Sequence, residues 1–303
     1  MPLLRVPSLR MKSAWKAHMA LMGANLIYGA NYSLAKEVMP VYAAPSGIII
    51  LRVAGSVLLF GAFWALRPEL PKRKDWGRFL LCALTGVMAN QLMFFEGLNL
   101  TTPIQAAIIL TANPILVMVA AAFLAGERIT SLRIAGIALG IAGALLLILQ
   151  RPSQPEGSDE LLGNVLIFLN AASYALYLVL VKRLMREYQL MTVMTWVFLP
   201  GLLMVLPFGA RSFLETPWLD LPPGIMGILV FIVLGTTFLA YLLNAYALST
   251  VSASVVSVYV YLQPFLASLF ALMLGKDSLN VRMLISALLV FTGVYLTSYR
   301  RKG

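Results

Sequence analysis

The sequence contains few charged residues and almost none of the groups that metal sites and disulfides require. Only 12% of its 303 residues are charged, whereas an ordinary soluble domain carries about a quarter. Cys82 is the single cysteine and His18 the single histidine, which excludes a Cys/His metal cluster and a disulfide framework within the chain. No Gly-x-x-x-x-Gly-Lys-Ser/Thr phosphate loop is present, so direct use of ATP is not expected. We therefore predict neither a bound metal nor a cofactor.

Hydrophobic residues make up 60% of the chain and are concentrated in ten runs. A helix needs about 20 mainly apolar residues to cross a bilayer. The predicted fold class is therefore all-α integral membrane, with ten transmembrane helices at about 15–36, 43–66, 77–98, 103–125, 131–150, 161–185, 190–210, 222–246, 252–274 and 280–299. Only residues 151–160, which contain Pro, Gly and Ser, are typical of a linker. They separate a first five-helix unit, 1–150, from a second, 161–303.

The net charge of +11 is distributed unevenly along the chain. If the N-terminus is cytoplasmic, most Lys and Arg residues fall in the segments that would also be cytoplasmic. This positive-inside bias predicts a multi-pass protein with both termini in the cytoplasm. The basic tails fit a position near anionic lipid, so we expect the lipid bilayer as a partner and no nucleic acid.

Two of the runs are interrupted near the middle by an amide side chain followed by proline. Asn113-Pro114 interrupts the fourth run, and Gln263-Pro264 lies 150 positions later in the ninth. A proline removes one helical hydrogen bond and clashes with the preceding turn. Matched interruptions in two halves point to a transporter's binding site, although both prolines could merely kink buried helices, which membrane proteins tolerate.

Polar side chains repeat on single helical faces in the first and sixth runs. Tyr28 and Asn31 are three residues apart, as are Tyr174 and Tyr177, and residues at this spacing are neighbours on a helix. Polar groups inside a bilayer usually face the bundle interior or a wet cavity. The alternative is that they only hold helices together through hydrogen bonds.

The second and third runs add two charges to the first half. Arg52 lies well inside the second run, and Gln91 and Glu96 lie in the third. A buried cation is costly unless it is paired or solvated. Arg52 could pair with Glu96 or extend its head group outward. Alternatively, it lines a vestibule in which it receives an anionic group of the substrate.

The second half repeats the first in the opposite orientation. Five runs per half is an odd number, so the second unit must be inverted in the bilayer, giving two inverted five-helix repeats. An offset of 150 then relates Gln91 to Tyr241. It also brings the two proline breaks to the same depth, which is the geometry of alternating access. A stripe of small residues in the fifth run, Gly136, Gly140 and Gly143, allows either a homodimer contact or close packing inside the protein.

The chain resembles the EamA-type transporters of the drug/metabolite transporter superfamily over nearly its whole length. The residues that carry the resemblance are Tyr28-Gly29-Ala30-Asn31, Leu51-Arg52, Gly97-Leu98-Asn99, Asn113-Pro114, Gly126-Glu127 and Gly143, echoed by Gln263-Pro264, Asp277 and Gly293. This resemblance implies a ten-helix bundle with a central cavity, in which the fifth and tenth helices are peripheral. It also implies a bacterial cytoplasmic (inner) membrane and export of amino acids or similar small metabolites.

We therefore expect a secondary transporter of a small polar metabolite. A drug-like cation exporter is less favoured because the one acid available, Glu96, is shallow, and a receptor or scaffold would leave the mirrored breaks unexplained. An intramembrane enzyme would need a nucleophile with a base or a carboxylate pair, which the membrane runs lack, so we expect no enzyme. The candidate substrate-binding residues are Tyr28, Asn31, Arg52, Gln91, Glu96, Asn113, Tyr174, Tyr177, Tyr241, Asn244, Tyr259 and Gln263, with helix breaks at Pro114 and Pro264.

Overall fold

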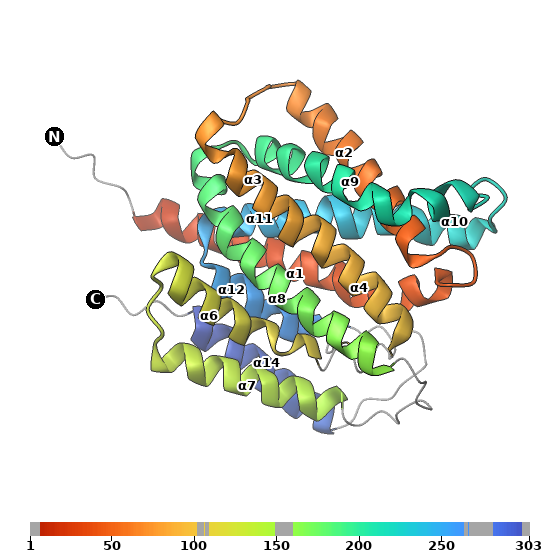
Figure 1. The fold of residues 1–303 in the computed structure, drawn as a ribbon. Coiled ribbons are helices and arrows are strands. Elements are labelled where there is room, and N and C mark those ends of the chain that lie inside the picture. Colours follow the sequence, from red (N-terminus) through yellow and green to blue (C-terminus); the bar gives the residue numbers. More distant parts are fainter. Residues whose placement is uncertain are drawn as a thin grey trace.

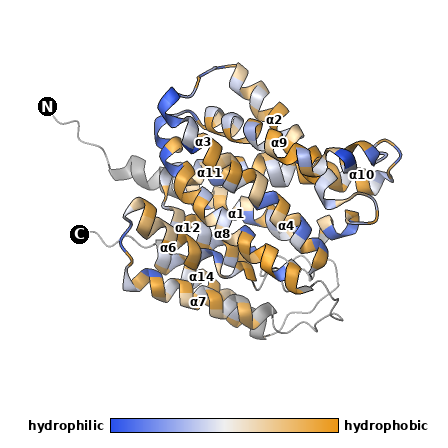
Figure 2. Cartoon of the chain, viewed as in Figure 1, coloured by the Kyte–Doolittle hydropathy of each residue, from blue (hydrophilic) through white to orange (hydrophobic). Residues whose placement is uncertain are grey.

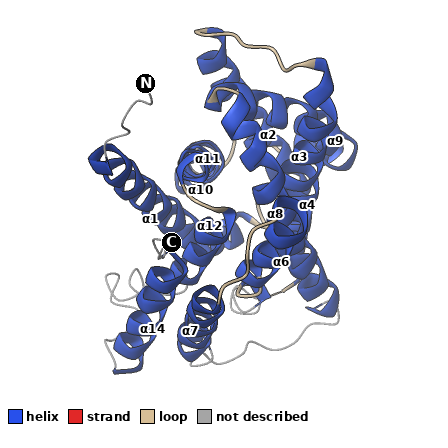
Figure 3. Cartoon of the chain, turned by 90° about the vertical axis from the view of Figure 1, so that its left-hand side faces the viewer, coloured by secondary structure: helices blue, strands red, loops and turns tan. Residues whose placement is uncertain are grey.

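A computed structural model of the chain describes residues 7–101, 106, 109–148, 160–263, 266 and 281–298. Within these ranges every regular element is a helix, and the helices are joined by short loops (Figure 3). The first half contains α1 (Pro7–Val38), α2 (Pro45–Ala65), α3 (Trp76–Ala83), η2 (Leu84–Met88), α4 (Ala89–Leu100), α6 (Asn113–Ala125) and α7 (Ser131–Ile148). The second contains α8 (Glu160–Glu187), α9 (Leu190–Glu215), α10 (Pro223–Val230), η3 (Phe231–Leu239), α11 (Ala240–Thr250), α12 (Ala253–Val258), η4 (Tyr259–Tyr261) and α14 (Val281–Ser298).

The predicted runs correspond to helical segments of this bundle. Five of the described segments are long and apolar enough to cross a membrane: 45–65, 73–100, 161–187, 190–215 and 223–250. Shorter apolar helices lie at 113–125, 131–143 and 284–297, and apolar residues predominate along most of the helices (Figure 2). Helix α1 begins eight residues before the predicted run and is more polar than the others. Pro264, the linker residues 151–159 and part of the ninth run lie outside the described residues.

Local sequence explains several helix boundaries. Pro45 begins α2 at a position where its missing N–H costs nothing, and Pro223 does the same for α10. Gly126 ends α6 in the left-handed conformation, with φ of 62°, which glycine adopts without strain. Ser252 caps α12, because its hydroxyl accepts a hydrogen bond from the N–H of Val255 at 3.3 Å.

Two helices contain π-helical segments at related places. Segment η2 joins α3 to α4, and η3 joins α10 to α11. A π-helical turn widens the helix and leaves backbone groups free for other partners, and such turns are frequent at functional sites. Here the carbonyl of Gly86 in η2 accepts a hydrogen bond from the Tyr241 hydroxyl at 3.0 Å. No periodicity in the sequence predicted either segment.

Pairs of contacts between the two halves repeat as a two-fold axis requires. A Cβ on Gly55 of α2 would lie 2.6 Å from Val233, and one on Gly201 of α9 would lie 2.6 Å from Val87. Gly55 corresponds to Gly201 and Val87 corresponds to Val233, and each correspondence is a shift of 146 positions. These contacts therefore relate the halves by an offset of 146, the same offset that separates Tyr28 from Tyr174 and Asn31 from Tyr177 in the sequence.

The fifth and tenth helices, α7 and α14, keep the offset of 150. Gly143 contacts the backbone of Ser286, and Gly293 contacts the backbone of Gly136. Gly143 corresponds to Gly293 and Gly136 to Ser286, each at an offset of 150. The hydroxyl of Ser286 also donates to the carbonyl of Gly143 at 2.5 Å. The glycine stripe therefore packs α7 against α14 inside the protein, and Gly140 of the same stripe receives the ring of Tyr261. The stripe is not free to form a dimer contact.

One end of the bundle, here called the basic side, carries the α2–α3, α6–α7 and α8–α9 connections (Figure 1). Glu127 and Lys182 form an ion pair there at 3.1 Å. The Tyr188 hydroxyl donates to Asp75 Oδ2 at 2.6 Å and accepts from the N–H of Lys72. The first turns of α1 and the last turns of α14 also lie at this end (Figure 1).

Candidate functional site

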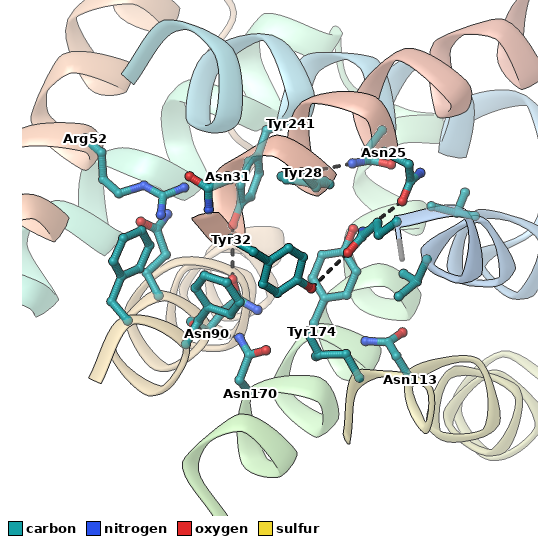
Figure 4. Close-up of a pocket in the computed structure, with 18 residues that line it drawn as sticks. Asn25, Tyr28, Asn31, Tyr32, Arg52, Asn90, Asn113, Asn170, Tyr174 and Tyr241 are labelled. Carbon is teal, nitrogen blue, oxygen red and sulfur yellow. Dashed lines mark hydrogen bonds between the residues drawn. The ribbon is translucent and has the colours of Figure 1, made fainter. Parts of the chain in front are cut away.

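A polar cavity of about 100 Å³ lies in the middle of the bundle, between helices of both halves (Figure 4). Helices α1, α2, α4, α6, α8, α11 and α12 all contribute to its wall. The lining residues are Asn25, Tyr28, Asn31, Tyr32, Arg52, Asn90, Gln91, Phe94, Phe95, Leu110, Asn113, Asn170, Tyr174, Tyr241, Asn244, Val256, Val260 and Gln263. The wall is therefore made mainly of carboxamide and aromatic side chains.

The structure brings nine of the twelve candidate residues together around this cavity. They are Tyr28, Asn31, Arg52, Gln91, Asn113, Tyr174, Tyr241, Asn244 and Gln263. Asn113 and Gln263, taken from the two interrupted runs, are among them, so the breaks reach the same chamber. A role in substrate binding stays a prediction for all nine.

The other three candidates do not line the cavity. Tyr177 lies behind the wall, where its ring packs directly over Gly86. Tyr259 is also buried, and its hydroxyl is hydrogen-bonded to His18 Nδ1 at 2.6 Å. Glu96 is partly buried on α4.

Several lining residues were absent from the candidate set, although helical spacing contains a signal for them. Asn25 lies three residues before Tyr28, and Asn170 lies four residues before Tyr174. Side chains at these spacings share one face of a helix. The remaining members are Tyr32, Asn90, Phe94, Phe95, Leu110, Val256 and Val260. The apolar ones could not be distinguished by sequence from the many hydrophobic residues that face lipid.

Arg52 is 4% exposed and has no carboxylate partner among the residues that the structure describes. Its Nε donates to Thr237 Oγ1 at 2.7 Å and its Nη2 to Thr236 Oγ1 at 3.3 Å. The guanidinium carbon lies 4.5 Å from the ring centroid of Phe95, a cation–π distance. The alternative of an Arg52–Glu96 pair is wrong. Successive residues of a helix point about 100° apart, so Glu96 does not follow Phe95 toward Arg52.

The second half fills the position that corresponds to Arg52 with a neutral side chain. The offset of 146 relates Arg52 to Phe198 and Phe95 to Tyr241. The rings of Phe198 and Tyr241 meet edge to face, with their centroids 5.0 Å apart. An aromatic pair thus makes the same helix contact that Arg52 and Phe95 make in the first half. The packing does not require a charge, so the positive charge is specific to one side of the cavity.

A chain of hydrogen bonds connects α1 to the ninth segment across the cavity (Figure 4). The Tyr32 hydroxyl donates to Gln263 Oε1 at 2.9 Å, and Gln263 Nε2 donates to Asn25 Oδ1, also at 2.9 Å. Asn25 Nδ2 in turn donates to the carbonyl of Leu21 at 2.8 Å. Gln263 is therefore fixed in orientation by α1.

Other buried carboxamide oxygens of the wall lack a partner. Asn31 Oδ1, Gln91 Oε1 and Asn113 Oδ1 accept no hydrogen bond in the described part of the chain. Asn113 makes one long bond, from Nδ2 to the carbonyl of Ala171 at 3.4 Å. A buried polar atom without a partner costs about 1–3 kcal/mol. These oxygens can accept hydrogen bonds from water or from a bound solute.

The interrupted fourth run ends one helix and starts another at this cavity. Pro114 stands in the first turn of α6, directly after Asn113, where a proline is tolerated. The carbonyl of Thr111 in the break accepts a hydrogen bond from the Tyr261 hydroxyl at 3.2 Å. The broken backbone is thus supported by the other half of the protein.

A chamber of this kind, walled by both repeats and by a discontinuous helix, is the arrangement of membrane transporters. Comparison with known proteins agrees. The EamA-like transporter family matches the chain twice, at residues 15–149 and 161–299, and the chain belongs to this family. It is a multi-pass membrane protein with the family's ten-helix, two-repeat fold, and it transports a small-molecule substrate.

Two relatives and one solved structure illustrate this membership. An "Uncharacterized transporter" of Archaeoglobus fulgidus is 26% identical over 290 residues, which cover 94% of this chain and 98% of the relative. The "Uncharacterized transporter YyaM" of Bacillus subtilis is 25% identical, with 93% of each chain covered. One crystal structure superposes with a TM-score of 0.73 at 19% identity, covering 92% of this chain and 95% of the other. That last likeness supports the fold alone.

Proposed function

We propose that the protein is a secondary transporter that exports a small polar metabolite, such as an amino acid, by alternating access through the central cavity. In this proposal the nine cavity-lining candidates bind the substrate. The anionic group of the substrate binds Arg52, while its donors bind the carboxamide oxygens that lack partners. The membrane is a bacterial inner membrane, with the basic side and both termini in the cytoplasm.

The observation that carries the proposal is the buried, unpaired charge of Arg52. A cation inside a membrane protein is costly, and it usually marks a substrate or ion pathway. Hydroxyl and ring contacts hold the guanidinium in place, but they do not neutralise it. The neutral pair Phe198–Tyr241 at the related position supports a functional rather than an architectural reason for the charge.

The size of the cavity favours a small substrate. A water molecule occupies about 30 Å³ of the liquid, so a cavity of about 100 Å³ has room for about three waters. A small metabolite such as an amino acid therefore fits when side chains of the wall move outward, and a larger solute would require a larger rearrangement. The aromatic side chains Tyr28, Phe94 and Tyr174 in the wall offer apolar surface to the rest of such a molecule.

A drug-like cation exporter fits the cavity less well. The charged side chain in the described wall is Arg52, which repels a cation, and Glu96 does not line the chamber. A receptor or scaffold would require no chamber shared by two repeats. Positive charge at the basic side supports the proposed orientation, because cytoplasmic loops carry an excess of Lys and Arg.

The test begins with cells that overexpress the protein and are challenged with a panel of toxic metabolites and metabolite analogues. Compounds to which the cells become resistant are then assayed by flux in proteoliposomes. Asn113→Ala should abolish resistance to the same compounds. Arg52→Gln should weaken binding of the anionic compounds by about 10- to 150-fold, since a hydrogen bond to a charged group contributes about 1.5–3 kcal/mol.

The matched control is Arg211→Gln, because Arg211 is exposed and paired with Glu215 away from the cavity. This variant should transport at the parent rate. If no compound in the panel shows protein-dependent flux, that result would count against transport through this chamber. An Arg52→Gln protein that moved every anionic compound at the parent rate would remove the anion site while leaving transport itself intact.

A further inference from the structure

A second cavity, of about 300 Å³, opens at the basic side, where three helix ends meet. It lies between the first turns of α3, the last turn of α6 and the last turns of α8. Its lining residues are Arg78, Leu124, Ala125, Glu127, Val179, Leu180, Lys182, Arg183 and Arg186. Four of these are basic and one is acidic, and none belongs to the central chamber.

The single carboxylate in this cavity is already neutralised. Glu127 Oε1 accepts from Lys182 at 3.1 Å, and Oε2 accepts from Arg133 at 3.1 Å. Arg186 is exposed and has no ion-pair partner among the described residues. Arg78 has only a loose contact, 3.7 Å, with Asp75. Arg78 of α3 and Arg186 of α8 therefore leave positive charge available in the wall of the cavity.

Charge is distributed differently at the two ends of the bundle. The segments 67–78, 127–133 and 182–187 at the basic side contain ten basic and four acidic residues. At the opposite end, segments 36–44 and 211–222 contain two basic and three acidic residues. Anions at a membrane surface are therefore attracted to the side that holds this cavity.

The same three helices also carry exposed apolar side chains close to the cavity. Leu80 and Leu81 of α3, Phe123 and Leu124 of α6 and Leu176 of α8 are all exposed, at 40% or more. Leu80 and Leu81 lie within one turn of Arg78, Leu176 lies within about two turns of Lys182, and Leu124 itself lines the cavity. A ligand that fits both parts has a phosphate head and hydrocarbon tails. A soluble phosphate would use the basic part alone.

We propose that this cavity is a binding site for one anionic phospholipid, with the phosphate between Arg78 and Arg186 and the acyl chains against α3, α6 and α8. Basic pockets between transmembrane helices are suited to anionic headgroups, because each Lys or Arg near the surface adds attraction. Lys182 holds Glu127 away from the phosphate. The site is independent of the transported substrate and of the central cavity.

The experiment measures lipid binding to the full-length purified protein by native mass spectrometry, with dioleoyl phosphatidylglycerol and dioleoyl phosphatidylcholine as probes. The parent and the exposed-surface control Arg211→Gln should retain phosphatidylglycerol and not phosphatidylcholine. The double variant Arg78→Gln/Arg186→Gln should bind phosphatidylglycerol about 30-fold more weakly, from the loss of two basic contacts. Arg186→Gln alone should weaken it by about fivefold.

Two further arms make the result decisive. Glycerol 1-phosphate and inorganic phosphate should not displace bound phosphatidylglycerol at equal concentration, because they lack the acyl chains. Effective displacement by either would assign the site to a soluble phosphate instead. Equal retention of the two phospholipids, or unchanged binding in Arg186→Gln, which removes an unpaired surface charge and should fold normally, would overturn the proposal.

Discussion

Gly293 lies where α14 crosses α7 in backbone contact, and a single added methyl group tests this packing. A Cβ at Gly293 would lie 2.5 Å from the carbonyl oxygen of Gly136 and 2.8 Å from the backbone nitrogen of Gly140. Both atoms belong to the backbone of α7, which cannot rotate away as a side chain can. Gly293→Ala must therefore push the two helices apart, and it should strain the hydrogen bond from Ser286 to Gly143.

The expected loss is the difference between two opposing effects. Replacing glycine by alanine inside a helix gains about 1 kcal/mol of helix propensity. Overpacking a close contact costs about 1–3 kcal/mol. Because the obstacles here are backbone atoms, the cost lies near the upper end of that range, and the net destabilisation should be about 2 kcal/mol. Gly61 of α2 provides the control, since a Cβ there meets nothing within 4 Å, and Gly61→Ala should gain up to about 1 kcal/mol.

The assay is the free energy of unfolding, measured by titrating dodecyl sulfate into maltoside micelles and following tryptophan fluorescence. Size-exclusion chromatography of the same samples should give the same oligomeric state for both variants and the parent. Equal unfolding free energies for Gly293→Ala and Gly61→Ala would refute the packing of α7 on α14. A change of oligomeric state in Gly293→Ala would place a subunit interface at these helices instead.

Three other predictions concern the basic side, and each is checked by the same unfolding titration. Glu127→Gln should destabilise the protein by about 1–3 kcal/mol, because it removes the carboxylate that binds Lys182. Tyr188→Phe should cost about 1–2 kcal/mol, since buried Asp75 loses its hydroxyl donor. Burial and the hydrogen bond to Asp75 raise the pKa of Tyr188 above its usual value of 10.0, so its contribution should be complete below that pH and lost as pH rises through the raised pKa. Gly126→Ala should cost about 1 kcal/mol through its positive φ alone, and an unchanged value would contradict the left-handed cap.

Features that depend on neighbouring residues were predictable from the sequence. Hydropathy runs fixed the helical segments because a span requires a minimum apolar length. Tyr28 and Asn31 were assigned to one face because helical spacing is local, and both line the cavity. The break at Asn113-Pro114 followed from proline chemistry, and α6 does begin there.

Features that depend on distant parts of the chain were not predictable in this way. Arg52 is held by Thr236 and Thr237, which lie more than 180 positions away, and nothing in the second run identifies them. The π-helical segments η2 and η3 arise where packing outweighs regular hydrogen bonding, and residue type alone carries no signal for them. The ring of Tyr261 fills the space above Gly140, which is 121 positions away in the chain, and neither local sequence indicates this contact.

The two halves of the protein resemble each other most in their contacts and least in the chemistry of the cavity. The two-fold axis exchanges one glycine–valine contact, Gly55 with Val233, for the other, Gly201 with Val87. Arg52 has no such counterpart. A cavity with identical halves would offer two equivalent binding positions for the charged group of a substrate. The substrate could then bind in either of two opposite orientations. Under the proposed function, one guanidinium on one side removes that degeneracy, so the anionic group of a substrate would point toward α2 whichever end of the cavity is open. In that proposal the single charge determines the orientation of the substrate, while the shared packing lets the repeats exchange their conformations.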